Sequence, residues 1–73
     1  MNLADLVKIR SEDVEKKRNT YITPIKDFGT FLKDELFFVR RFENDAAIAF
    51  RSFDGKEHIL PQNKLKKFKL TGR

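Results

Sequence analysis

The second half of the chain consists of short apolar runs separated by turn residues, which is the pattern of a meander of β-strands. The runs cover residues 35–43, 46–53 and 58–60. The pair Asn44-Asp45 separates the first two runs, and Asp54-Gly55 separates the second from the third. Asp-Gly between apolar runs is a strong signal for a tight hairpin. These positions predict three consecutive strands joined by tight turns.

A further strand is predicted on each side of these three. Residues 21–25 are rich in β-branched and aromatic side chains, but Pro24 restricts this strand to a sheet edge or a bulge. After a break at Pro61, residues 64–70 form the last strand. The result is a five-stranded domain, which we expect to cover residues 21–73.

The first 20 residues fit two local structures. Four apolar side chains have roughly helical spacing behind Asn2, a candidate N-cap: Leu3, Leu6, Val7 and Val14. Residues 7–9 alternate apolar, basic and apolar, which also fits a strand. We expect residues 1–20 to form a short helix or an irregular arm.

The register of the hairpin formed by residues 35–43 and 46–53 follows from the requirement that one face be buried. A three-residue loop sets Phe42 opposite Ile48, whereas a two-residue loop sets Ile48 opposite Arg41. The longer loop gathers five apolar side chains on one face, so we expect it. That buried face comprises Leu36, Phe38, Phe42, Ile48 and Phe50, and the outer face comprises Phe37, Val39, Arg41, Ala49, Arg51 and Phe53. With the flanking strands, the expected core is Ile22, Leu36, Phe38, Phe42, Ile48, Phe50, Leu60 and Leu65.

Two segments resemble the Src-homology-3 family. Residues 33–39, Lys-Asp-Glu-Leu-Phe-Phe-Val, resemble its diverging turn and second strand. Residues 58–65, His-Ile-Leu-Pro-Gln-Asn-Lys-Leu, resemble its closing segment, in which a strand ends at Pro, makes one 3₁₀ turn and resumes. The resemblance spans about residues 21–70. It implies a mainly β fold, a small five-stranded Src-homology-3-like barrel, to which the short N-terminal helix or irregular arm is attached.

The residues that peptide-binding members of this family use are missing. Those members hold a polyproline helix with a Trp after the second strand and a Tyr in the 3₁₀ turn. This chain has no Trp, and Lys64 stands where the Tyr falls. A proline-rich ligand is therefore not expected. The basic last strand is instead similar to the DNA-binding barrel at the C-terminus of retroviral integrases, which implies a role in binding nucleic acid.

Composition bounds the class of protein. A chain of 73 residues forms one small domain, and without cysteine it has no disulfide, thiolate metal site or thiol nucleophile. The longest apolar run, residues 36–39, is far shorter than the roughly 20 residues that span a membrane. The first residues lack the basic and apolar regions of a secretory signal. We therefore expect a cytoplasmic protein.

The positive charge is concentrated near the end of the chain. Lys and Arg number 16 against 11 Asp and Glu, a formal net charge of +5. Basic and acidic residues balance in residues 1–36, so the excess lies in residues 37–73. From His58 onward there is no acid, and the basic residues are Lys64, Lys66, Lys67, Lys69 and Arg73. Such a run attracts phosphate or an acidic protein surface.

Residues for catalysis are scarce. His58 is the only histidine, and Asp34 and Glu35 are neighbours that point to opposite faces if they lie in a strand, so they make a poor acid–base pair. No phosphate-binding glycine motif is present, and one histidine with scattered carboxylates provides no metal site. We expect no enzymatic activity, no cofactor and no metal.

The remaining hypothesis is non-enzymatic binding. We expect a nucleic-acid-binding module that contacts phosphates through a basic face on the C-terminal strands: Arg41, Arg51, Lys64, Lys66, Lys67 and Lys69. Phe37 or Phe53 on the outer face would stack on an unpaired base. The alternative is a small docking adaptor or inhibitor, such as a phage regulator, that binds an acidic protein surface. In that case the strand broken by Pro24 would accept a partner strand. Neither hypothesis involves a membrane or a small-molecule substrate.

Overall fold

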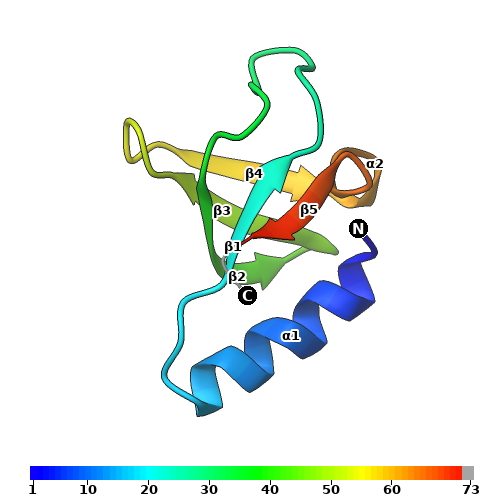
Figure 1. Cartoon of the computed structure of the whole chain (residues 1–73). Helices are drawn as coiled ribbons and strands as arrows, with labels where there is room; N and C mark the ends of the chain where they lie inside the picture. Colours follow the sequence, from blue (N-terminus) through cyan, green and yellow to red (C-terminus); the bar gives the residue numbers. More distant parts are fainter. Residues whose placement is uncertain (72–73) are drawn as a thin grey trace.

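One five-stranded antiparallel sheet, with a helix packed beside it, makes up the fold (Figure 1). The computed structural model describes residues 1–71, so Arg73 of the basic tail lies outside the described residues. The elements in chain order are α1 (Leu3–Glu15), β1 (Tyr21–Pro24), β2 (Phe37–Glu43), β3 (Ala46–Arg51), β4 (Glu57–Pro61), α2 (Gln62–Leu65) and β5 (Phe68–Thr71). The expected mainly β class and five strands are confirmed.

The strand order is β4-β3-β2-β1-β5, so β4 and β5 are the two edges. Over residues 1–71 these edges do not pair with each other, and the sheet is not closed; α2 alone joins them along the chain. The radius of gyration is 11.1 Å, which matches the roughly 11 Å expected of a compact chain of this length. Within the described range, no helix is long and apolar enough to cross a membrane.

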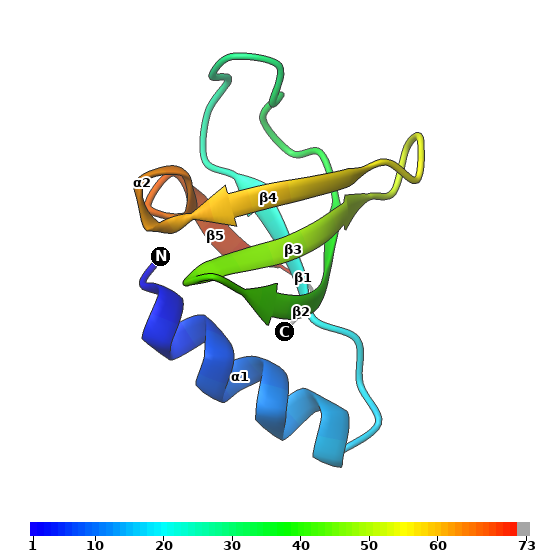
Figure 2. The same ribbon diagram turned by 180° about the vertical axis from the view of Figure 1, so that it is seen from behind.

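Helix α1 resolves the ambiguity of the N-terminal segment in favour of a helix. The Asn2 side chain caps it by accepting a hydrogen bond from the Ala4 amide at 2.8 Å, and Asp5 lies in the positively polarised first turn. Leu6 is fully buried and belongs to the core of the sheet. Figures 1 and 2 show α1 lying along the side of the sheet where β2 ends. The helix therefore covers one open side of the sheet.

A buried carboxylate joins the end of α1 to the start of β1. Asp13 is fully buried, and the Thr20 hydroxyl donates a hydrogen bond of 2.7 Å to its Oδ2. The Arg18 guanidinium lies 3.0 Å from the Asp13 Oδ1, and the Arg18 amide donates to the Asp13 carbonyl at 2.7 Å. Thr20 is itself fully buried, and its carbonyl accepts from the Val39 amide of β2 at 2.9 Å. This chain of contacts holds the helix against the sheet.

The hairpin β2–β3 does not have the predicted three-residue loop. Asn44 and Asp45 both have positive φ, 51° and 59°, and form a two-residue turn in which Ile48 lies opposite Arg41. Asn and Asp tolerate this left-handed conformation, and its twist matches that of the flanking strands. A β-bulge between Val39 and Arg41 then shifts the register, so that Phe38 lies opposite Phe50. The local turn chemistry decided the loop, and the bulge absorbed the extra residue.

The bulge also decides which side chains face the core. Phe37, Val39 and Ala49, expected on the outer face, are fully buried. Three residues of the expected core are wrong: Leu36 is 40 % exposed, and Phe38 and Phe50 are partly exposed on the outer face. Phe42 is partly buried and packs against the core from the inner face. The fully or almost fully buried state of the other four is confirmed: Ile22, Ile48, Leu60 and Leu65.

The expectation that Pro24 marks an edge strand is wrong. β1 lies inside the sheet, between β2 and β5, and Pro24 is its last residue, paired with Phe68. The pairing of β1 with β2 is confined to Tyr21 and Ile22. Since that pairing has ended before Pro24, the missing N–H interrupts no hydrogen bond to β2.

Replacing Asp13 with Ala should lower the free energy of unfolding by about 2–3 kcal/mol, because it leaves the buried Thr20 hydroxyl without its acceptor. Urea denaturation followed by far-ultraviolet circular dichroism measures this. Glu15→Ala is the matched control, because Glu15 is an exposed acid on the same helix. Equal stability of the two variants would contradict the role given to Asp13.

Candidate nucleic-acid interface

Four phenylalanine rings pack against one another where the β1–β2 loop, residues 25–36, folds over the sheet. Their centroids lie 5.0–5.7 Å apart: Phe28, Phe31, Phe37 and Phe68. We call these four side chains the ring cluster. Phe28 and Phe31 also exchange two backbone hydrogen bonds of 2.9 Å, which close the loop on itself. The ring cluster thus fixes the loop against β2 and β5.

Three of the six predicted binding residues surround this ring cluster. The Lys67 ammonium lies 4.9 Å from the centroid of Phe28, and the Lys64 ammonium lies 5.7 Å from that of Phe31. The Arg51 guanidinium carbon lies 5.7 Å from the same Phe31 centroid. Cations over ring faces are attracted by the ring quadrupole. The structure therefore brings together cations from β3, from α2 and from the turn that follows α2.

Arg51 is already engaged in the fold. Its Nη2 donates to the Thr30 carbonyl at 2.9 Å, and its Nη1 lies 3.6 Å from Asp54. Its Nε lies 3.3 Å from a Glu35 oxygen, an ion pair by distance without hydrogen-bond geometry. The side chain is only 13 % exposed. Arg51 therefore ties the β1–β2 loop to the β3–β4 turn and offers little charge to a ligand.

Arg41 is likewise compensated. It lies on the outer face of β2, opposite Ile48, with its Nε 3.1 Å from Glu43 and its Nη2 3.5 Å from Glu57. The hydrogen bond to Glu43 raises the pKa of Arg41, and the Glu57 carboxylate adds to this. Ile48 is 1 % exposed on that face, so the arginine and its partners lie over an apolar side chain.

The other four predicted cations keep their charge available. Lys64, Lys66, Lys67 and Lys69 are exposed, and within residues 1–71 they make no ion pair. Lys69 projects from β5 opposite Thr23, on the face of the sheet away from the ring cluster. These lysines lie within six consecutive positions of α2, the following turn and the edge strand β5. All four side chains are exposed, but Lys69 lies on a different face of the sheet from Lys64 and Lys67.

Two further cations lie outside the six predicted binding residues: Lys26, which sequence reasoning missed, and Arg40, which it placed only on a strand adjoining the basic tail. Lys26 is exposed and comes next to Ile25, whose amide donates to the Lys67 carbonyl at 2.9 Å. Arg40 is exposed at the β-bulge and, in the described part of the chain, has no ion pair. The loop contact next to Lys26 depends on tertiary packing, so no local signal could have found Lys26, and the bulge that exposes Arg40 depends on tertiary packing as well.

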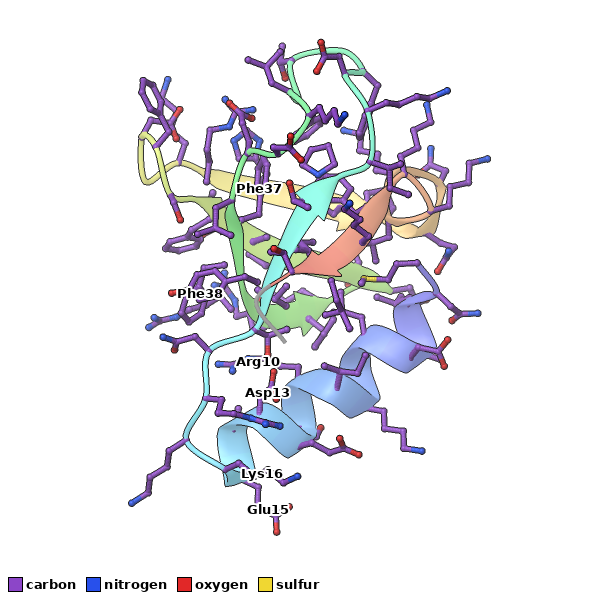
Figure 3. The ribbon with its side chains drawn as sticks, in the orientation of Figure 1. Arg10, Asp13, Glu15, Lys16, Phe37 and Phe38 are labelled. Carbon is purple, nitrogen blue, oxygen red and sulfur yellow. The ribbon has the colours of Figure 1, made fainter. Side chains whose placement is uncertain are left out.

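Of the two residues predicted to stack on a base, one is buried and the other is exposed. Phe37 is fully buried, so its expected place on the outer face is wrong; it belongs to the ring cluster because the bulge shifts the alternation by one residue. Phe53 is 89 % exposed in the β3–β4 turn. Phe37 and Phe38 are consecutive residues of β2, and Figure 3 shows their side chains well apart from each other.

Comparisons with known proteins found no relative of this chain. No family model, no curated protein and no solved structure matches the chain. Among residues 1–71, no three His, Cys, Asp or Glu side chains are grouped as metal ligands.

His58 lies against the ring cluster and next to Arg51. Its ring meets those of Phe31 and Phe37 edge to face at 5.4 and 5.7 Å. Its Nε2 is buried and, among the residues up to 71, has no hydrogen-bond partner. Burial lowers the pKa of His58 below its usual value of 6.5, and the charge of Arg51 lowers it further. Asp54 and Glu35 oppose this shift, and Lys64 adds to it. The folded protein therefore favours the neutral imidazole.

We expect the free energy of unfolding to fall as the pH drops from 7 through 6.5 and to level off once the lowered pKa of folded His58 is passed. The unfolded chain binds the proton first, so acidification favours unfolding in that window. The Asp54 pKa is lowered by a hydrogen bond from the Lys56 amide, so its contribution is lost only at more acidic pH, below its usual 3.8. Urea titrations between pH 7.5 and 5 measure the slope, and His58→Phe should flatten it. An unchanged slope in that variant would refute the assignment.

Proposed function

We propose that this protein is a non-enzymatic nucleic-acid-binding module that contacts phosphates through the lysines of α2 and β5. The observation that carries the proposal is the set of four exposed lysines that form no ion pair within residues 1–71: Lys64, Lys66, Lys67 and Lys69. Two of them lie over aromatic rings, which limits their freedom before a ligand arrives. Binding of phosphates by such lysines releases counterions and needs no contact to a base edge.

Arg51 and Arg41 have secondary roles in the proposed binding of phosphates. Arg51 holds the β1–β2 loop that carries Phe28 and Phe31, on which Lys64 and Lys67 lie. Arg41 is paired with Glu43 and Glu57 and contributes less net charge than an isolated cation. Phosphate contacts are therefore led by the lysines, and Lys26 extends the cationic surface on the side of the loop.

We infer a Src-homology-3-like barrel as the fold type. Supporting this is the succession in which β4 ends at Pro61, Gln62–Leu65 makes one helical turn and β5 resumes. The β1–β2 loop and the short β2–β3 and β3–β4 turns follow the same order along the chain. A Lys in place of the ligand-binding Tyr, and the lack of any Trp, favour a ligand other than a proline-rich peptide.

A protein partner with an acidic surface is the second candidate. The observation in its favour is the open edge strand β4, on which Ile59 is 61 % exposed. An open edge can pair with a strand of another chain. This candidate uses β4, whereas phosphate binding uses α2 and β5, so variants separate the two.

Lys66→Glu with Lys67→Glu should weaken binding to single- and double-stranded oligonucleotides alike. Two lost phosphate contacts should reduce the slope of log affinity against log salt by about two. Fluorescence anisotropy at two salt concentrations measures both effects. Lys8→Glu with Lys16→Glu is the matched control, because it makes the same charge change at two exposed positions, one in α1 and one at its C-cap.

The control variant should bind more tightly than the α2–β5 variant. Equal weakening of both would mean that only the net charge matters, and the proposed surface would be wrong. No binding of the unaltered protein to any oligonucleotide at low salt would refute the nucleic-acid proposal and favour the docking surface on β4.

A further inference from the structure

Three aromatic residues stand side by side on the outer face of the sheet, one on each of three neighbouring strands. The register places Tyr21 of β1 opposite Phe38 of β2, and Phe38 opposite Phe50 of β3. Residues directly opposite each other project from the same face. The rings of Tyr21 and Phe38 meet edge to face at 5.7 Å. We call these three side chains the outer aromatic row.

The outer aromatic row is not part of the core. All three side chains are partly exposed, and none belongs to the buried cluster that Phe37, Phe31 and Phe68 help to form on the inner face. Helix α1 reaches one ring of the row, since the Arg10 guanidinium lies 5.5 Å from the centroid of Phe38. Figure 3 shows Phe38 on the flank of the sheet, with Arg10 below it. Packing within this chain therefore leaves these rings partly open to solvent.

Cations lie on both sides of the row. Lys69 of β5 is opposite Thr23, and Thr23 shares the face of Tyr21 because it is two residues away in the same strand. At the other side, Val39 and Phe42 both face inward, so the bulge residue Arg40 lies with Arg41 on the outer face. Arg40 and Lys69 are exposed and, among residues 1–71, unpaired with any carboxylate. Positive charge therefore flanks the rings.

We propose that the outer aromatic row stacks on unpaired bases, so that the ligand of this protein is a single-stranded nucleic acid. This inference rests on the proposed function, in which the lysines of α2 and β5 bind phosphates. Lys69 belongs both to those lysines and to the face that carries the row. A strand bound at β5 therefore continues over β1, β2 and β3 without leaving the outer face.

The dimensions and the charges agree with this ligand. The path from β5 over β1 and β2 to β3 crosses three strand spacings, or about 14 Å, and is long enough to hold more than one base. Glu57 lies opposite Phe50 on β4, and its carboxylate would repel a phosphate there, so the track ends at β3. Base faces are covered by their neighbours in a duplex but exposed in a single strand, and stacking on aromatic rings tolerates any base. Single strands should therefore bind more tightly than duplexes.

Four probes test the inference by fluorescence anisotropy: labelled dT15, labelled rU15, a 15-base-pair duplex and an abasic 15-mer that keeps the phosphates. Unaltered protein should bind dT15 or rU15 about 5-fold or more tightly than the abasic strand, since one base–ring contact contributes roughly 1–3 kcal/mol. The tighter of dT15 and rU15 identifies the sugar that is preferred. Equal binding of all four probes would overturn the inference.

Phe38→Leu and Phe50→Leu should each weaken dT15 binding about 5-fold or more and leave abasic binding unchanged. Phe53→Leu tests the stacking position that the sequence predicted, because Phe53 is highly exposed in the β3–β4 turn and lies outside the row. If Phe53→Leu weakens binding and the row variants do not, the stacking surface is misplaced. If the lysine variant loses abasic binding but the row variants bind dT15 normally, phosphate binding stands and stacking is wrong.

A measurement without any substitution guards against misfolded variants. The chain has one Tyr and no Trp, so its intrinsic fluorescence reports Tyr21 alone. Stacking of bases on the row should quench this fluorescence when dT15 is added, after correction for absorbance, and the abasic strand should not. Binding of dT15 by anisotropy without quenching of Tyr21 would contradict the placement of bases on the row.

Discussion

The packing of Phe37 against Phe31 and Phe68 is the contact on which the rest of the structure depends. Phe31 comes from the β1–β2 loop, Phe37 from the start of β2 and Phe68 from β5, so the last strand of the sheet meets the loop and β2 at one point. A chain of this size without cysteine has only its core to hold such segments together. The position of the loop, and with it that of the cations on Phe28 and Phe31, follows from this packing.

Local sequence signals were reliable where a turn or a cap decided the structure. Gly55 in the Asp-Gly pair has φ of +70°, and Asn2 caps α1, as each residue type favours. The inward and outward faces of β2 were predicted wrongly because an unbroken alternation was assumed. The bulge at Arg40 interrupts that alternation. It is stabilised by the packing of Phe37 and Val39 against core residues from other elements, which the sequence of β2 alone does not reveal.

For the candidate surface, too, the sequence predicted local features and missed those that depend on tertiary contacts. The sequence located the basic residues from position 64 to 69, because a run of lysines without acids is visible in the chain itself. It did not show that Arg51 donates a hydrogen bond to the Thr30 carbonyl, since Thr30 is 21 residues away along the chain. Formal charge therefore counts residues, whereas the charge offered to a ligand depends on which cations the fold has already paired.

The bulge has a consequence for how β2 can vary. Arg40 is one residue more than pairing with β3 requires, because Val39 lies opposite Ala49 and Arg41 opposite Ile48, the next residue along β3. A strand without Arg40 would keep each of these neighbours on its present face. Pairing with β3 therefore does not restrict which residue stands at position 40. A substitution there can adapt the surface to another ligand while the sheet stays the same.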